Sequence, residues 1–178
     1  IGIITKARKV LCQRTLTTLY YSFIYPYLIY GLEVWGKTYD KYLKNLIIIQ
    51  KRVIRIISNL KPRDHTNETF KKLNILTIPK LYIYKVFFFM FKFNKNMLPP
   101  IFQPLFTYNI DVHSHSTRQA LELRIPKTKT EVLKRSICYT GVKIFNHLSK
   151  IINTSSLKIV KTSLREHLIK QPMSNIFS

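Results

Sequence analysis

Acidic residues are scarce in this sequence, and their scarcity limits the chemistry that the chain can perform. Only 8 of the 178 residues are Asp or Glu, and no two of them are adjacent. The aspartates Asp40, Asp64 and Asp111 stand far apart in the sequence. Phosphoryl transfer by two metal ions requires clustered carboxylates. We therefore expect no catalytic residue and no cofactor in this chain.

Glycine and cysteine are also sparse. The 4 Gly form no Walker motif, no dinucleotide fingerprint and no nucleophile elbow. The 2 Cys exclude a disulfide framework and a cysteine-based zinc module. We interpret Cys12 and Cys138 as buried apolar positions. His113 and His115 would need a further ligand to hold a metal ion, so no metal site is predicted there.

Basic residues are abundant and occur along the whole chain. Lys and Arg number 30, and the formal net charge is +22. Hydrophobic residues make up 46% of the chain, which is enough for a core and excludes a disordered basic tail. Like charges repel in a compact protein, so this excess favours a polyanionic partner. Nucleic acid and an anionic membrane surface are the two candidates.

Apolar residues recur with a helical period, which predicts a mainly α fold. The 6–32 segment is expected to form one or two helices, with a kink or an end at Pro26. Asp40 is the expected N-cap of a helix that ends near Leu60. The other expected helices begin near Thr66 and cover about 77–96, 134–152 and 156–170. Pro99, Pro100 and Pro104 mark a loop, and residues 119–126 are expected to form a short extended segment.

The 40–60 segment combines an apolar face with a cationic face. At 100° per residue, nine apolar side chains between Leu43 and Leu60 occupy half of the helix circumference. The opposite arc holds basic residues and no acid after Asp40, although a solvated face normally mixes both signs. This pattern predicts contact with a nucleic-acid backbone. The basic residues of this arc are Lys41, Lys44, Lys51, Arg52 and Arg55.

Two other segments are rich in apolar residues. The 81–95 helix is apolar nearly all round, is too short to span a bilayer, and is therefore expected in the core. The 15–32 segment is uncharged over 18 residues, but its Tyr, Thr, Ser and Pro content disfavours a membrane span. A membrane-associated basic helical protein remains an alternative, as does a stand-alone helical RNA-binding protein. Neither a membrane nor a small-molecule substrate is the expected partner.

A series of short motifs resembles the C-terminal region of reverse transcriptases from non-LTR retrotransposons of the jockey-like group. The 19–36 segment is similar to the stretch after the polymerase palm, and the 46–57 and 76–82 segments are similar to the next two motifs. Ser116 to Arg118, Arg135 to Leu148, and Ser156 to Leu164 match the C-terminal pattern in order. The chain departs from the family before Asn146, where Trp is usual, and at Ser149, where Pro is usual.

The resemblance implies that this chain is the thumb and post-thumb region of an RNA-directed DNA polymerase. The catalytic Asp-Asp pair of such a polymerase would lie upstream, so no polymerase activity is expected of this chain alone. The implied partners are an RNA or DNA template-primer and the upstream palm domain. Arg118 and Arg135 join the helix cations as predicted nucleic-acid contacts. The implied division is a thumb-like helical region at 1–95, a Pro- and His-containing loop at 96–118 and a C-terminal helical region at 119–178.

The first residue, Ile1, indicates a fragment of a longer reading frame. The sequence near it has no apolar run followed by a small-residue cleavage site, so secretion is not expected. A retroelement protein would be nuclear or cytoplasmic.

Overall fold

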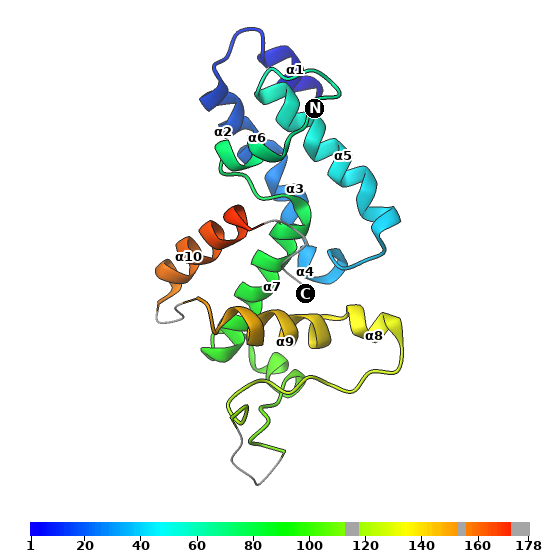
Figure 1. The fold of residues 1–178 in the computed structure, drawn as a ribbon, viewed down its shortest axis with the longest axis vertical. Helices are drawn as coiled ribbons and strands as arrows, with labels where there is room; N and C mark the ends of the chain where they lie inside the picture. The colour runs from blue at the N-terminus through cyan, green and yellow to red at the C-terminus, as the bar shows by residue number, and fades with distance from the viewer. Residues whose placement is uncertain (113–117, 153–155, 172–178) are drawn as a thin grey trace. The chain divides into compact units, whose positions relative to one another are not determined.

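A computed structural model of the chain describes residues 1–112, 118–152 and 156–171. It confirms the prediction of a mainly α protein (Figure 1). The elements in chain order are α1 (Gly2–Ala7), α2 (Gln13–Phe23), α3 (Tyr25–Ile29), α4 (Leu32–Trp35), α5 (Asp40–Ile57), α6 (Asn67–Lys72), α7 (Ile78–Asn94), the 3-10 helix η1 (Pro100–Leu105), α8 (Glu131–Arg135), α9 (Ile137–Leu148) and α10 (Leu157–Lys170).

Two of the expected helices are interrupted. The 6–32 segment is divided among several helices, and Pro26 lies in the first turn of α3, where its missing N–H costs nothing. The 134–152 segment is divided at Ser136, whose extended ψ of 156° ends α8 before α9 begins. Asp40 is the first residue of α5 and not its N-cap, which is Tyr39. In that first turn, the negative charge of the Asp40 carboxylate is stabilised by the positive end of the helix dipole.

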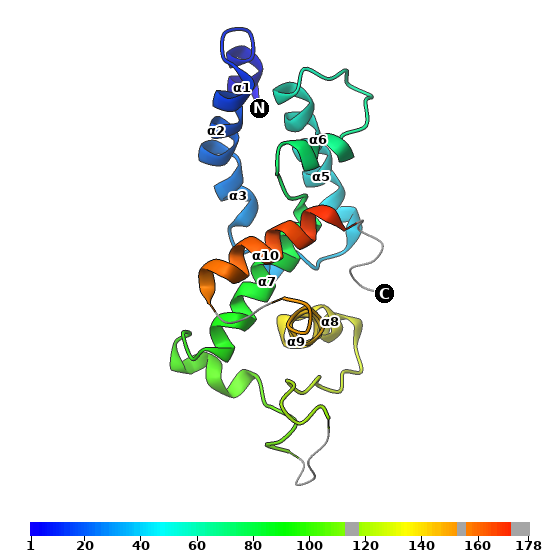
Figure 2. The same ribbon diagram turned by 60° about the vertical axis from the view of Figure 1, so that its left-hand side comes forward.

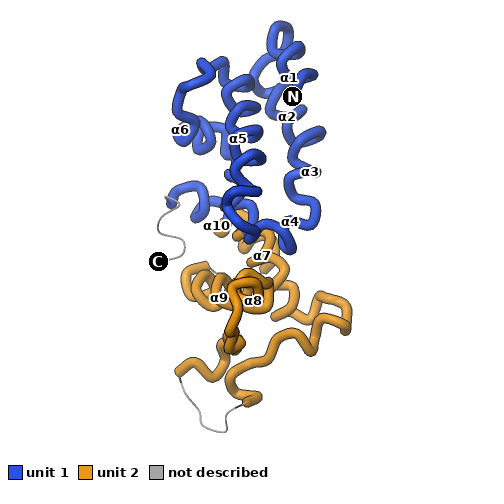
Figure 3. Tube along the Cα trace, turned by 90° about the vertical axis from the view of Figure 1, so that its right-hand side faces the viewer, with its two compact units in different colours: residues 1–82, 165–178 blue, residues 83–164 orange. Residues whose placement is uncertain are grey.

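The chain forms two compact units, shown in different colours in Figure 3. Unit 1 comprises residues 1–82 and 165–178, and unit 2 comprises residues 83–164. The sequence-based division at 95 and 118 differs from this one. The boundary between the two units falls inside α7, which is continuous from Ile78 to Asn94. Helix α10 also contributes residues to both units.

The core of unit 1 contains a polar network centred on Gln50, whose side chain is 1% exposed. Its Nε2 donates to the Tyr20 hydroxyl at 3.1 Å and to the Leu76 carbonyl at 3.0 Å. Its Oε1 accepts from the backbone N–H of Ile78 at 3.0 Å. Ile78 is the first residue of α7, so its N–H has no partner inside that helix. One amide therefore links α5 to α2 and to the start of α7.

Tyr20 gives this core a pH dependence. Burial raises the pKa of the Tyr20 phenol to about 12. An unfolded tyrosine titrates near 10, so the stability that this group contributes is present below pH ~10 and is lost as the pH rises towards ~12. We expect unit 1 to lose about 2 to 3 kcal/mol across this window. Urea unfolding of the parent and of Tyr20→Phe, each followed from pH 9 to pH 12, should show a weaker pH dependence for the variant; equal slopes would contradict the prediction.

In unit 1, the C-terminal part of α10 is fixed by Arg165. Its Nη2 donates to the Tyr21 hydroxyl at 2.8 Å and also to the carbonyl of Asn74. Arg165 thereby joins α2 and the end of α6 to a segment that is distant in sequence.

Aromatic side chains build the core of unit 2. Phe87 of α7 packs on Phe145 of α9 with ring centroids 5.4 Å apart, and Phe93 packs on Phe106 at 4.8 Å. A Cβ at Gly141 would lie 3.1 Å from the Met90 sulfur, so glycine permits the close approach of α9 to α7. The prediction that the 81–95 helix belongs to the core is confirmed, because most of its side chains are buried. Figure 2 shows α7 as one continuous helix.

The segments between α7 and α8 differ in part from the prediction. The Pro-marked loop contains the 3-10 helix η1. The expected extended segment at 119–126 consists of a turn followed by a single antiparallel bridge between Tyr108 and Leu123. No described residue extends that bridge into a sheet.

Three helices are followed, two residues after their last helical residue, by an asparagine in the left-handed backbone conformation. Asn59, Asn74 and Asn96 follow α5, α6 and α7 with φ values of 54°, 54° and 53°. After each asparagine, the next N–H returns to a carbonyl five residues earlier, as from Leu60 to Arg55 at 2.9 Å. This is the Schellman geometry, in which Gly is usual and Asn is the second choice. A chain with 4 Gly thus uses Asn to stop its helices.

Candidate nucleic-acid interface

Helix α5, labelled in Figure 1, contains all five basic residues predicted from its periodicity. The helix lies within unit 1. Lys41, Lys44 and Arg52 are exposed, whereas Lys51 and Arg55 are partly buried. Their shared arc follows from the helical geometry of an uninterrupted 18-residue element. We call these five residues the α5 cationic face.

Arg55 is partly committed to the fold. Its Nε donates to the backbone carbonyl of Asp64 at 2.9 Å, which holds the loop after α5. Lys41 Nζ lies 4.8 Å from the centre of the Tyr42 ring, a cation–π contact on the surface. Lys44 and Arg52 form no ion pair with a described residue. The most available charges of the α5 cationic face are therefore Lys41, Lys44 and Arg52.

The opposite side of α5 is buried, with one unexpected member. Leu43, Val53, Ile54 and Ile57 are buried as predicted. Ile49, predicted on the apolar face, is exposed, and the buried position beside it is Gln50. Gln50 lies near the centre of the apolar arc, where it is the only polar residue. Its position in the sequence therefore indicates a buried side chain with hydrogen-bond partners.

The other two predicted contacts do not belong to this face. Arg118 and Arg135 both lie in unit 2, Arg118 exposed in a turn and Arg135 partly buried at the end of α8. Ser116 and Thr117, which precede Arg118 in its motif, lie outside the described residues. His113 and His115 also lie outside them.

The two cysteines are less buried than predicted. Cys12 is exposed, and Cys138 is partly buried. Cys12 precedes the first turn of α2, where hydrogen bonds from Thr15, first through its side chain and then through its backbone, lower the pKa of the thiol. No three His, Cys, Asp or Glu side chains gather as a metal site in the part of the chain that the structure describes.

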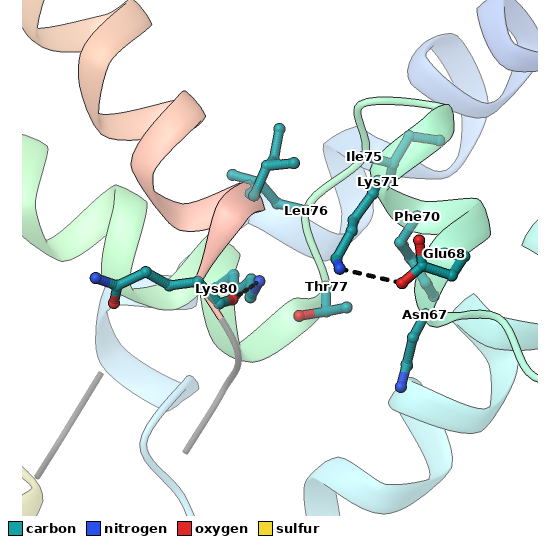
Figure 4. Close-up of a pocket in the computed structure, with 10 residues that line it drawn as sticks. Asn67, Glu68, Phe70, Lys71, Ile75, Leu76, Thr77 and Lys80 are labelled. Atoms are coloured by element: carbon teal, nitrogen blue, oxygen red, sulfur yellow. Dashed lines mark hydrogen bonds and ion pairs between the residues drawn. The ribbon is translucent and has the colours of Figure 1, made fainter. Parts of the chain in front are cut away.

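Unit 1 also contains a pocket of about 270 Å³ beside α6 and the start of α7 (Figure 4). Its charged groups are paired within the fold. Lys71 is 3.1 Å from Glu68, and Lys80 donates to the Gln171 carbonyl at 2.7 Å. Burial, and secondly the charge of Lys71, lower the pKa of Lys80. This pocket therefore offers less unpaired charge than the α5 cationic face.

Each helix within residues 1–112, 118–152 and 156–171 is too short or too polar to cross a membrane. The 15–32 segment, considered above as a span, is divided among α2, α3 and the first residue of α4.

A second group of basic residues, which was not predicted to form one surface, surrounds a groove in unit 2. The groove has a volume of about 550 Å³. Its basic residues come from the segment after the Tyr108–Leu123 bridge and from α9 and its end. They are Arg124, Lys127, Lys143, His147 and Lys150. In the sequence, helical spacing places Lys143, His147 and Lys150 on one face, but Arg124 and Lys127 have no periodic relation to them.

Comparison of the chain with protein-family models, with curated proteins and with solved structures finds no match.

Proposed function

We propose that this chain is a non-catalytic nucleic-acid-binding region that grips the sugar-phosphate backbone through the α5 cationic face. In the fuller form of this proposal, it is the thumb and post-thumb part of a retroelement RNA-directed DNA polymerase, and its ligand is a template-primer. The fuller form rests on the order of the sequence motifs described above.

One observation carries the proposal. Helix α5 is fixed from behind by buried Leu43, Val53 and Ile54, and it exposes basic side chains with no acid after Asp40. A helix that only faces solvent gains from pairing opposite charges on neighbouring turns, and α5 does not use that stabilisation after Asp40. Basic residues on a rigid helix suit phosphate contacts, which position nucleic acid without reading its sequence.

The test is the salt dependence of binding to a labelled duplex. Each phosphate contact contributes about −0.9 to the slope of log affinity against log salt. The variant Lys41→Gln, Lys44→Gln, Arg52→Gln should flatten that slope by about 2 to 3 units, for all sequences alike. The apolar face is untouched, so far-ultraviolet circular dichroism should be unchanged.

A control with the same loss of charge separates a local contact from the effect of net charge. Lys9, Arg14 and Lys72 are exposed cations of unit 1 that do not lie on α5. Their triple Gln variant should change the slope by less than about one unit. Equal flattening by the two variants would show that α5 has no special part in binding.

A further inference from the structure

The groove in unit 2 is built around an unusual contact between a side chain and the backbone. Asn146 of α9 donates from Nδ2 to the Leu123 carbonyl at 2.8 Å, and its Oδ1 accepts from the Leu123 N–H at 3.2 Å. The Asn146 amide thus pairs with Leu123 as a neighbouring strand would. Asn146 thereby holds one wall of the groove against α9.

The same segment is held on its other side by backbone hydrogen bonds. The Arg124 N–H donates to the Thr107 carbonyl at 2.8 Å, and the Asn109 N–H donates to the Glu122 carbonyl at 3.0 Å. The backbone at Arg124 is therefore fixed from two directions. A fixed wall reduces the conformational entropy that would be lost when a ligand binds.

The charge in this groove is strongly unbalanced. Glu122 is the only acid among the described residues that line it, and it pairs with Lys150 at 2.8 Å. Arg124 and Lys127 form no ion pair with any described residue. Lys143 Nζ lies 5.3 Å from the centre of the Tyr139 ring, which leaves its charge unneutralised. Three cations are thus available to an anionic ligand.

The shape and lining of the groove indicate which anion it accepts. The described residues that line it include no Phe, Tyr or Trp, and His147 is the only ring among them on which a base could stack. Sites for small molecules typically enclose most of the ligand and are lined mainly by apolar groups. Basic and amide side chains supply the polar part of the lining of this groove, beside Leu123 and Ile125, and they suit the phosphates of a polynucleotide strand.

We propose that the unit 2 groove is a second, independent nucleic-acid site, in which Arg124, Lys127 and Lys143 contact successive phosphates of one strand. The proposal goes beyond the role of the α5 cationic face, because the groove contains no residue of unit 1. It requires neither polymerase activity nor a sequence-specific contact.

The first test uses a fluorescein-labelled single-stranded RNA whose affinity is measured across a salt series. Loss of three phosphate contacts on a single strand flattens the slope of log affinity against log salt by about 2 units. We expect that result for Arg124→Gln, Lys127→Gln, Lys143→Gln in the full chain. The control variant Lys92→Gln, Lys95→Gln, Lys158→Gln removes the same charge from exposed positions of unit 2 outside the groove. Equal slopes for the groove and control variants would overturn the proposal.

The second test is a gain of binding. Glu122→Gln removes the acid of the groove and releases Lys150, so it should strengthen binding roughly four- to eightfold at about 0.1–0.15 M salt and steepen the slope by about one unit. Glu131→Gln is the matched control, because Glu131 also pairs with a lysine, Lys134 at 2.6 Å, but lies outside the groove. Equal effects of the two substitutions would assign the gain to net charge and overturn the proposal.

The α5 variant, measured beside these, separates the two proposals. If only the α5 variant weakens binding, the groove is not a site and the proposed function stands. If only the groove variant weakens binding, the groove is a site and the role of α5 is wrong.

Discussion

Replacement of Gln50 by leucine is expected to destabilise unit 1 by about 3 to 5 kcal/mol. Leucine fills a similar space but removes every hydrogen bond of the Gln50 amide. The N–H of Ile78 and the carbonyl of Leu76 then remain buried without those partners, and each such group costs about 1 to 3 kcal/mol. Urea unfolding followed by circular dichroism gives the change in the free energy of unfolding.

An exposed glutamine of the same unit provides the control. Gln13 on α2 donates to the Ser58 hydroxyl at 3.2 Å, in contact with solvent. Water can replace that partner, so Gln13→Leu should cost less than about 1 kcal/mol. A similar cost for both substitutions would mean that the Gln50 network contributes nothing beyond ordinary surface hydrogen bonding.

Ile54→Asp is expected to unfold unit 1 or to destabilise it by at least about 4 kcal/mol. Ile54 is 0% exposed, and no basic residue lies on its side of α5 to pair with a buried carboxylate. Burial disfavours the ionised form and raises the pKa of such an aspartate. Its penalty is therefore largest above that pKa, and part of the lost stability should return as the pH falls from that pKa towards ~4. Urea unfolding at pH 7 and at pH 4 measures both effects.

Ile48→Asp makes the same chemical change on the other side of the same helix. Ile48 is 51% exposed and lies among the basic residues of the α5 cationic face. Its replacement should cost less than about 1 kcal/mol of stability. The new acid should nevertheless weaken duplex binding, since it neutralises one of the neighbouring cations. Unchanged binding by a folded Ile48→Asp variant would count against the role of this face.

The long helices could be predicted from the sequence, and the breaks between short ones could not. Helices α5, α7 and α10 carry apolar residues at regular spacing over many turns, and their observed bounds lie within a few residues of the expected ones. The end of α8 at Ser136 has no such signal, because apolar periodicity continues across it. The break is a change in one backbone angle at Ser136, ψ of 156°, where the Ser136 hydroxyl donates to the Leu133 carbonyl at 2.6 Å.

The candidate site was predictable to the extent that it depends on one helix. The side chains of the α5 cationic face share an arc because 3.6 residues make a turn, so their arrangement follows from spacing alone. The unit 2 groove depends on Asn146 pairing with the backbone of Leu123, two residues separated by 23 positions. No periodic pattern indicates such a contact, so the sequence showed the excess charge but not the surface that collects it.

The Gln50 network also determines how the length of α5 can vary. Gln50 fixes the rotation of α5 about its own axis, because its three partners lie on other segments. One residue inserted between Lys44 and Gln50 would turn Lys41 and Lys44 by about 100° away from Arg52. We expect homologous sequences to accept many substitutions on the outer side of α5 but to preserve its residue count before Gln50. Insertions and deletions should instead occur in the loop that follows Asn59, because a change of length there does not rotate any part of α5.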